Sequence, residues 1–347
     1  MLIETTRRTA PVAVFVALCA LASGPQHATG AEALASEPLK ILLLNDDGIG
    51  AAGIRAMQAA LQGVGHTVVV VAPAGNVSGA GANANLGEAF RILPADDASD
   101  PIQNEFKVFR TTAGRVPLSS PVPATPAEVV ILARAVTPFV PDLVISGIND
   151  GANAGLVSFL SGTVAGASIA ATKFSPFGPR PAIAVSLEGI TAPFPAPVGF
   201  AQNFDDAAAF IVALIEHLQR HPSNGELLPP GIFLNVNYPA LPSGNIKGVK
   251  VTSQGESVLF HSAAFAEPQA LQGLPLNPFD PTQFCVPATS GGLCVAGAVP
   301  IPNNETVKVA DTSAVVDGYI SISPFATDYT AHGALGGVVM RLHELKY

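Results

Sequence analysis

Short, almost continuous apolar runs that are rich in β-branched residues recur along the chain. Apolarity at successive positions indicates strands that are buried on both faces, as in a parallel sheet. We expect such strands at residues 39–44, 67–71, 142–146, 182–186 and 232–236.

Alanine-rich windows with helical spacing lie between these runs, at residues 54–61, 126–136, 163–173 and 205–220. In the last window, Phe210, Leu214, Ile215 and Leu218 recur at intervals of three or four residues, which is the period of one helix face. Strands that alternate with helices predict a doubly wound α/β fold.

The texture changes after about Pro239, where proline and glycine become dense. Residues 267–304 read as a long loop or insertion, followed by a strand at 319–323 and a terminal helix at 338–345. We therefore expect one domain over residues 38–347, with a core at about 38–240 and a C-terminal extension at about 241–347.

The first residues have the pattern of an export signal. Arg7 and Arg8 precede an apolar run at 11–22, and Ala28, Gly30 and Ala31 offer small residues for cleavage. The run is shorter than the roughly 20 apolar residues that a membrane anchor requires. We expect a signal peptide at 1–31 and a periplasmic or secreted protein, with the export route left open.

Composition narrows the possible partners. The chain is 48% hydrophobic and 12% charged, with a net charge of -9, unlike the basic surface of a protein that binds nucleic acid polymers. Tryptophan is absent and aromatic residues make up 6%, so base stacking has little material. After the apolar run at 11–22, the sequence contains no apolar segment long enough to span a membrane. A small anionic ligand would have to be bound by a metal ion or by backbone amides.

Asp46 and Asp47 come directly after the first predicted strand. Two adjacent carboxylates near a buried strand end are costly unless a positive charge accompanies them. Carboxylate and amide oxygens suit Mg²⁺, Mn²⁺ or Ca²⁺. The pair taken alone also fits an ordinary loop, in which one aspartate caps the next helix and the other is solvated.

Gly48, Gly50 and Gly53 match the GxGxxG pattern of dinucleotide-binding proteins, which raises the alternative of an NAD-binding oxidoreductase. Two points weigh against it. A pyrophosphate at this helix start would face two carboxylates, and the acid that should bind the ribose after the second strand is missing from residues 72–76.

Small polar residues and glycines follow the other predicted strands as well, at 76–79, 146–155 and 161–163. Ligands of open α/β sheets bind at the carboxyl ends of the strands, so these segments should converge. Ser161, Gly162 and Thr163 open a predicted helix, where free amides and the helix dipole favour a phosphate.

Taken together, these motifs resemble the SurE family in order and spacing. They are the segments 45–48, 78–79, 125–126, 146–149, 151–155, 161–164, 235–237 and 318–324. The resemblance implies a Rossmann-like three-layer sandwich with a mostly parallel sheet. It also implies a C-terminal extension that forms oligomer contacts, in a homodimer or homotetramer.

The resemblance further implies a metal-dependent 5′/3′-nucleotidase, also called an acid phosphatase, that hydrolyses nucleoside monophosphates. The metal ligands would fall on Asp46, Asp47, Ser78 and Asn149. Three departures suggest a weak or inactive homologue as an alternative: residues 156–160 lack the family's acidic residue, Val77 replaces a basic residue, and 124–129 alter a GTPxDC motif.

The mechanism expected from these ligands is attack by a metal-activated water. Ser161, Gly162, Thr163 and Asn153 would hold the phosphate, so the expected catalytic residues are Asp46, Asp47, Asn153, Ser161 and Thr163. An aspartyl-phosphate formed on Asp46 is the alternative chemistry.

The cysteines give the first testable prediction. Cys19 lies in the expected signal peptide, which leaves Cys285 and Cys294 as a pair in an exported chain. We expect them to form a disulfide that closes a surface loop. Thiol titration of the denatured mature protein should find no free sulfhydryl, and two free sulfhydryls would contradict the bridge.

Overall fold

The computed structural model describes residues 37–95, 104–188, 203–257 and 305–328, together with the strands β10 (Ala264–Ala266) and β11 (Cys294–Ala296). The expected signal peptide, the terminal helix at 338–345, Cys285 and most of the 267–304 insertion lie outside the described residues. Among the helices that are described, none is long and apolar enough to cross a membrane.

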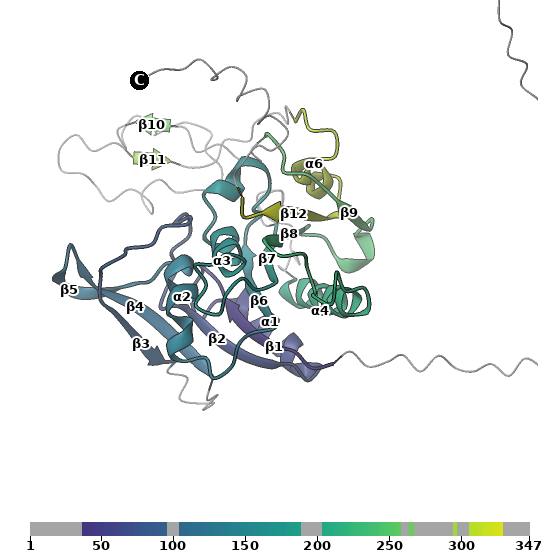
Figure 1. The fold of residues 1–347 in the computed structure, drawn as a ribbon. Helices are drawn as coiled ribbons and strands as arrows, with labels where there is room; N and C mark the ends of the chain where they lie inside the picture. The colour runs from purple at the N-terminus through teal and green to yellow at the C-terminus, as the bar shows by residue number, and fades with distance from the viewer. Residues whose placement is uncertain are drawn as a thin grey trace, which may run out of the picture. The chain divides into compact units, whose positions relative to one another are not determined.

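A single mixed sheet forms the centre of the fold (Figure 1), with the strand order β3-β4-β2-β1-β6-β7-β8-β12-β9. Its five middle strands pair in parallel, as the apolar runs predict. These are β1 (Lys40–Leu44), β2 (Thr67–Pro73), β6 (Leu143–Asp150), β7 (Ala182–Leu187) and β8 (Ile232–Tyr238).

The outer strands are mostly absent from the sequence prediction. They are β3 (Phe90–Pro94), β4 (Glu105–Ala113), β5 (Val116–Pro123), β9 (Val249–Val251) and β12 (Ile320–Ala326). Only β12 was expected, as a strand at 319–323. β3, β5 and β9 are short or largely exposed, whereas β4 is mostly half-buried and carries polar residues among its apolar ones. All four therefore lack a continuous apolar run, and β5 contains prolines, which edge strands tolerate.

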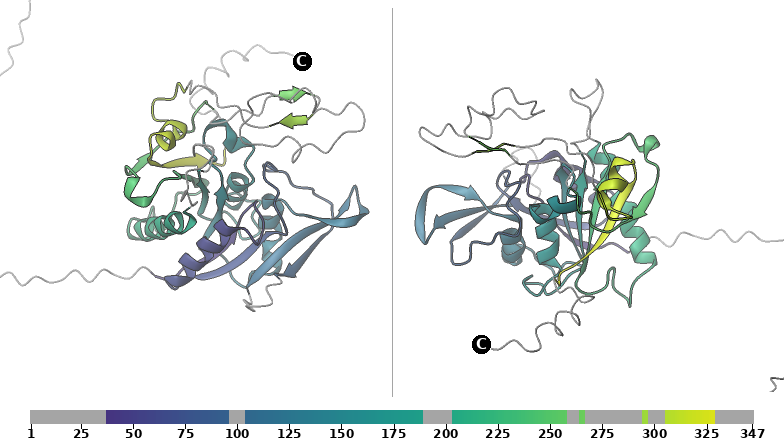
Figure 2. Two further views of the ribbon diagram at one scale, coloured as in Figure 1. Left: turned by 180° about the vertical axis from the view of Figure 1, so that it is seen from behind. Right: turned by 90° about the horizontal axis from the view of Figure 1, so that it is seen from above.

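Helices cover both faces of the sheet (Figures 1 and 2), which confirms the α/β fold. One face is packed by α1 (Ala52–Gly63) and α4 (Phe204–Arg220), and the other by α2 (Pro126–Leu132) and α3 (Gly162–Ala170). All four match predicted helices. A short helix that was not predicted, α6 (Asp311–Val316), packs against β12.

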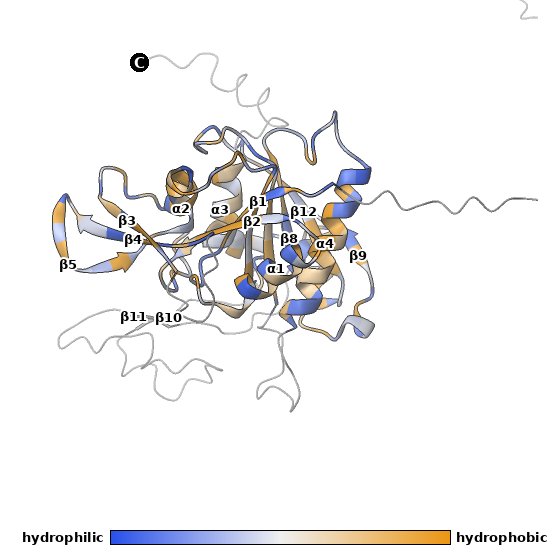
Figure 3. Ribbon diagram, turned by 90° about the horizontal axis from the view of Figure 1, so that it is seen from below, coloured by the Kyte–Doolittle hydropathy of each residue, from blue (hydrophilic) through white to orange (hydrophobic). Residues whose placement is uncertain are grey.

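The alternation of side chains along β1 explains why its sequence is apolar without interruption. Ile41 and Leu43 pack with Met57 of α1, whereas Leu42 and Leu44 pack with Val164 of α3. Every one of these side chains is fully buried or nearly so. Seen from below, β1 and β2 carry mainly hydrophobic colours, while α4 shows both kinds (Figure 3).

The start of α2 gives a structural role to one departure from the family pattern. Thr125 and Glu128 form a capping box, in which the Thr125 hydroxyl accepts from the Glu128 amide and the Glu128 carboxylate accepts from the Thr125 amide at 2.8 Å. The second Glu128 oxygen accepts two hydrogen bonds from Asn85, at 2.7 and 2.6 Å. Glu128 therefore anchors the loop that follows β2 to this helix.

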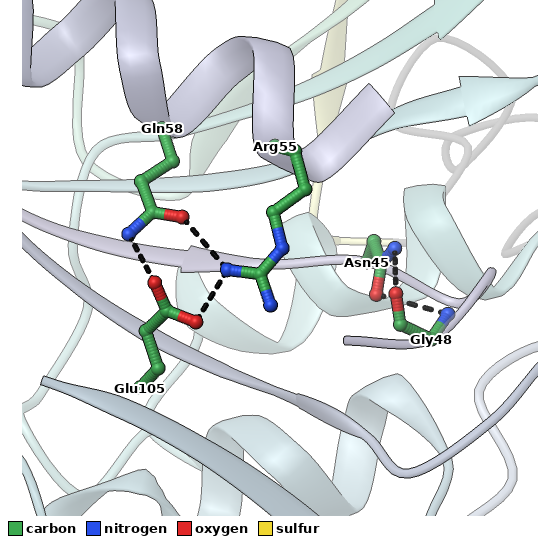
Figure 4. Close-up of polar contacts among 5 residues, drawn as sticks. All are labelled: Asn45, Gly48, Arg55, Gln58 and Glu105. Atoms are coloured by element: carbon green, nitrogen blue, oxygen red, sulfur yellow. Dashed lines mark hydrogen bonds and ion pairs between the residues drawn. The ribbon is translucent and has the colours of Figure 1, made fainter. Parts of the chain in front are cut away.

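A polar cluster joins α1 to β4 (Figure 4). The Glu105 carboxylate is buried; one oxygen accepts from Gln58 at 2.6 Å and the other pairs with Arg55. The Arg55 side chain is 35% exposed. The pair thus compensates a buried carboxylate with a cation at the protein surface.

Removing only the cation should therefore destabilise the fold. We expect Arg55→Met to lower the free energy of unfolding by about 2–4 kcal/mol, because it leaves a buried carboxylate without its partner. The double variant Arg55→Met, Glu105→Gln should recover at least about half of that loss, because no charge remains buried. Urea denaturation measures both.

The matched control is Arg91→Met, at an exposed position on β3. Its effect should stay within about 0.5 kcal/mol. If Arg55→Met and Arg91→Met lowered the free energy of unfolding equally, Arg55 would not stabilise the fold by compensating the Glu105 charge.

Candidate active site

The turn after β1 places two carboxylates side by side at the carboxyl edge of the sheet. The Asn45 side chain closes this turn (Figure 4), because its amide donates to the Gly48 carbonyl at 2.9 Å and its oxygen accepts from the Gly48 amide at 3.2 Å. Gly48 has a φ of 101°, which favours glycine. Asp46 and Asp47 lie within this turn, so their positions follow from the backbone.

Asp46 is 2% exposed and connects three segments of the chain. The Thr163 hydroxyl donates to its carboxylate at 2.6 Å, and the Val77 amide donates to its carbonyl at 2.8 Å. A Cβ on Gly162 would lie 2.9 Å from the Asp46 side chain. A glycine is thus required here for α3 to reach the aspartate.

Asp47 is held by the loops that follow β2 and β6. One carboxylate oxygen accepts from the Asn76 side chain at 3.3 Å, and the other accepts from the Asp150 amide at 3.2 Å. Ser78 contributes a further hydrogen bond to Asp47 through its side chain, and its amide donates to Asn76 at 2.9 Å. The predicted convergence of strand ends is present around this residue.

The surroundings of both aspartates disfavour the charged form and raise the pKa of each. Burial raises the pKa of Asp46, against the hydrogen bonds from Thr163 and from the backbone at Gly162 and Thr163. Burial, with the nearby charges of Asp46 and Asp150, raises the pKa of Asp47 to about 6. Across the described ranges, neither aspartate forms an ion pair with lysine or arginine.

Two desolvated carboxylates without a cationic side chain fit a divalent cation. No group of three or more His, Cys, Asp or Glu in the described part of the chain could hold a metal ion. A site here would therefore depend on the two aspartates together with neutral oxygens. Ser78, which contacts Asp47, and Asn149, which precedes Asp150, are such residues.

Asn149 and Asn153 differ in how closely the structure ties them to this pair. Asn149 is 8% exposed, and its side-chain amide donates to the Gly151 carbonyl at 2.7 Å. Asn153 is 5% exposed, and its side-chain amide donates to the Ser186 hydroxyl at 2.8 Å. Its carbonyl accepts from Asn235 at 2.8 Å. The observed contacts of Asn153 are therefore with β7, with β8 and with the Ser158 hydroxyl, which donates to its carbonyl at 2.9 Å, and its phosphate-binding role stays a prediction.

Ser161 caps α3, because its hydroxyl oxygen accepts from the Val164 amide at 3.0 Å. The next two residues direct their backbone hydrogen bonds toward Asp46. The predicted phosphate site at Ser161, Gly162 and Thr163 thus adjoins the predicted metal site and shares Asp46 with it.

A cavity of about 430 Å³ opens beside Ser161. Its walls are formed by one side of α3, by Phe233 of β8 and by Phe325 of β12. The lining also carries polar residues, among them Ser168, Thr252, Gln254 and the carboxylate of Asp328. The cavity offers an apolar space next to the predicted phosphate site.

Two of the three glycines of the dinucleotide-like pattern have packing roles. A Cβ on Gly48 would lie 2.9 Å from the Gly75 backbone, and a Cβ on Gly53 would lie 2.0 Å from the Ile148 carbonyl oxygen. Gly50 has open space around it. Close contacts of the β1–α1 turn and of α1 therefore explain Gly48 and Gly53 without a bound pyrophosphate.

Two residues of the site were not singled out from the sequence. Asp150 supplies an amide to Asp47 and a charge that raises its pKa, and Asn76 bridges Asp47 to Ser78. Asp150 directly follows Asn149 at the end of β6, so a third strand-end carboxylate was the available signal.

The fold and the site define a doubly wound α/β protein with a carboxylate-based site at the carboxyl edge of its parallel strands. The profile of the family described as Survival protein SurE matches residues 41–260. The chain belongs to the SurE family.

Relatives extend this match over most of the chain. A 5′-nucleotidase SurE of Pseudoalteromonas atlantica is 34% identical over 307 residues, covering 86% of this chain and 97% of the relative. A 5′/3′-nucleotidase SurE of Citrobacter koseri is 33% identical over 297 residues, covering 85% and 93%. The crystal structure of the SurE protein from Aquifex aeolicus superposes with a TM-score of 0.60 at 27% identity, covering 87% of this chain and 99% of that one.

The raised pKa of Asp47 predicts how the metal-free protein responds to pH. A carboxyl whose pKa rises from 3.8 to about 6 on folding binds its proton more tightly when folded, so the stability it contributes falls as the pH rises through that window. Asp47→Asn should therefore raise the unfolding free energy of EDTA-treated protein at pH 8 by about 1–2 kcal/mol, after allowance for solvent screening.

Denaturant titrations at pH 4 and pH 8 check this, and the gain should shrink toward the lower pH. Asp205→Asn, at an exposed carboxylate in the first turn of α4, is the control. A loss of stability in Asp47→Asn at pH 8 would show that its hydrogen bonds outweigh its buried charge.

Proposed function

We propose that this protein is a divalent-metal-dependent phosphomonoester hydrolase that acts on nucleoside monophosphates. The observation that carries the proposal is the Asp46–Asp47 pair, which is desolvated, has raised pKa values and lacks a cationic side chain among the described residues. The names of the two relatives support the nucleotidase activity.

Asp46, Asp47, Ser78 and Asn149 would hold the cation, with Mg²⁺ or Mn²⁺ favoured and Ca²⁺ as a further candidate for such oxygen ligands. When bound, a divalent cation polarises phosphoryl oxygens and lowers the pKa of a coordinated water.

The protein's own groups prepare this site. The Thr163 hydroxyl orients the Asp46 carboxylate, and the Asp150 amide with the Asn76 side chain orients that of Asp47. With a cation on Asp46, the amides at Gly162 and Thr163 would be shared with a phosphate at the start of α3. Asn153 and Ser161 would complete the phosphate site.

The cavity beside Ser161 supports the choice of substrate. Its volume of about 430 Å³ lies in the range of small-molecule sites. Phe233, Phe325 and Val164 offer apolar contact, and Ser168 and Gln254 offer hydrogen bonds. A ring-bearing alcohol such as a nucleoside suits this lining better than a highly charged group.

Two further parts of the proposal rest on the sequence. The pattern at residues 1–31 supports export by a signal peptide, to the periplasm or the medium. The resemblance of the C-terminal motifs to the family supports a homodimer or homotetramer.

A panel of phosphomonoesters tests the activity. Purified protein should release phosphate from nucleoside 5′- and 3′-monophosphates, lose this activity in EDTA and regain it with Mn²⁺ or Mg²⁺. Asp47→Asn should lower kcat/KM by at least about 100-fold, because it removes a charged ligand. Asp205→Asn should stay within about twofold of the unaltered protein.

The same experiment separates the alternatives. Binding of Mn²⁺ and nucleotide without turnover would identify an inactive homologue, and metal-free binding of NAD would identify a dinucleotide-binding protein. Full metal-stimulated turnover by Asp47→Asn would refute the assignment of this site.

A further inference from the structure

The loop between Asn153 and Ser161 connects the predicted phosphate-binding residues, and the segments after β9 hold it in place. Gly155 lies two residues after Asn153, at the start of a short 3-10 helix, Gly155–Phe159. Its amide donates to the Asp311 carboxylate at 3.0 Å, and its carbonyl accepts from the Gln254 side chain at 3.0 Å. Both polar groups of one backbone position are thus bound by side chains distant in the sequence.

The fit around Gly155 is close. Its φ is 59°, in the left-handed region. A Cβ there would lie 2.1 Å from the Ser257 carbonyl oxygen and 2.7 Å from the Thr312 side chain. The same Ser257 carbonyl accepts from the Leu156 amide at 3.2 Å. The loop therefore meets the C-terminal part of the chain as a packed joint.

Asp311 is the acceptor at the centre of this joint. It is fully buried, and a single carboxylate oxygen accepts from the amides of Gly155, Gly255 and Thr312, at 3.0, 2.8 and 2.8 Å. Among the residues that the structure describes, the other oxygen has no hydrogen-bond partner. Since a buried carboxylate without a cation is costly, a residue of this type needs a reason beyond filling space.

Glu305 fixes the second contact of the joint. Its carboxylate accepts from the Ser257 hydroxyl at 2.8 Å and from the Thr312 hydroxyl at 2.7 Å. Burial acts to raise the pKa of Glu305, but these two hydrogen bonds and two more from backbone amides lower that pKa to about 2. The carboxylate therefore stays charged and keeps Ser257 in place under Leu156.

We propose that Asp311 is a positioning residue for substrate binding, which acts by holding Gly155 and, through it, the Asn153–Ser161 loop. Asn153 is already fixed to the sheet through its backbone amide, which donates to the Asn237 side-chain oxygen at 2.7 Å. The Asp311 joint is the next fixed point after Asn153, and the Ser158 hydroxyl and the Leu160 carbonyl make further hydrogen bonds before Ser161. Thr163, two residues beyond Ser161, donates to Asp46, so the loop is held from both ends.

This inference rests on the proposed function for its kinetic consequence but not for its structural one. Phosphate is bound by the loop's end in the ground state and in the transition state, so loosening the loop should raise KM more than it lowers kcat. Loosening should also speed amide hydrogen exchange in residues 152–160, whether or not the protein is an active phosphatase.

The test combines hydrogen exchange by mass spectrometry with kinetics on a nucleoside monophosphate. Asp311→Ala should speed exchange in residues 152–160 by at least about tenfold, because it removes a charged acceptor. It should raise KM at least about fivefold, with kcat and the dissociation constant for Mn²⁺ changing less than about twofold.

Asp311→Asn is the conservative variant. It keeps one oxygen as acceptor and places its amide where the partnerless oxygen lies, so exchange and KM should return to within about threefold of the unaltered protein. Asp317→Ala is the matched control directly after the same helix, since Asp317 is exposed and pairs with Lys250 at 3.7 Å. It should change neither quantity.

Gln254→Ala provides a second, milder break in the same joint, decided by hydrogen exchange alone. It should speed exchange in the loop by about threefold without affecting α1. Unchanged exchange in residues 152–160 in folded Asp311→Ala, or in Gln254→Ala if the former does not fold, would overturn the inference. If the unaltered protein hydrolyses no phosphomonoester while these exchange effects occur, the proposed function fails and the joint stands.

Discussion

The desolvation of two adjacent carboxylates at the end of β1 is the constraint on which the site depends. Asp46 is almost completely buried, and its charge disfavours ionisation of Asp47. The surrounding contacts fit this constraint: the Asn45 turn fixes the backbone, Thr163 donates to one carboxylate, and the Asp150 amide donates to the other. The protein supplies hydrogen bonds to both acids but, in its described part, no cationic partner.

This arrangement explains why the glycines of the motifs stand where they do. Gly162 allows the start of α3 to touch Asp46, and Gly53 allows α1 to approach the end of β6. In both cases a side chain would push a helix away from the strand ends. Gly53, together with Gly48 and Gly50, also produces a sequence that resembles a dinucleotide-binding pattern, although the close approach that Gly53 permits is between α1 and the Ile148 carbonyl.

The middle of the fold and the acidic pair could be predicted from the sequence because their signals are local. A strand buried on both faces is apolar at every position, as in β1, and a strand-end turn is rich in Asn, Asp and Gly. The strands β3 and β5 gave no such signal because most of their residues are exposed, and β4 gave none because its half-buried positions carry polar as well as apolar residues. Asp150 was overlooked since a single aspartate after Asn149 looks like any polar turn residue.

Long-range contacts account for the rest of what the sequence could not show. Asn235 and Asn237 matched a motif without a role, and the structure uses both to bind the backbone of Asn153, more than eighty positions away. Asp311 accepts a hydrogen bond from the amide of Gly155, which lies 156 positions away in the sequence. It belongs to a helix of six residues, which is too short to show an amphipathic pattern. Its chemistry depends wholly on the partner that folding brings to it. A buried carboxylate of this kind costs stability unless its oxygens accept hydrogen bonds, and those of Asp311 come from backbone amides. The C-terminal part of the chain therefore contributes to the site by fixing a loop, without touching the acidic pair in any observed contact.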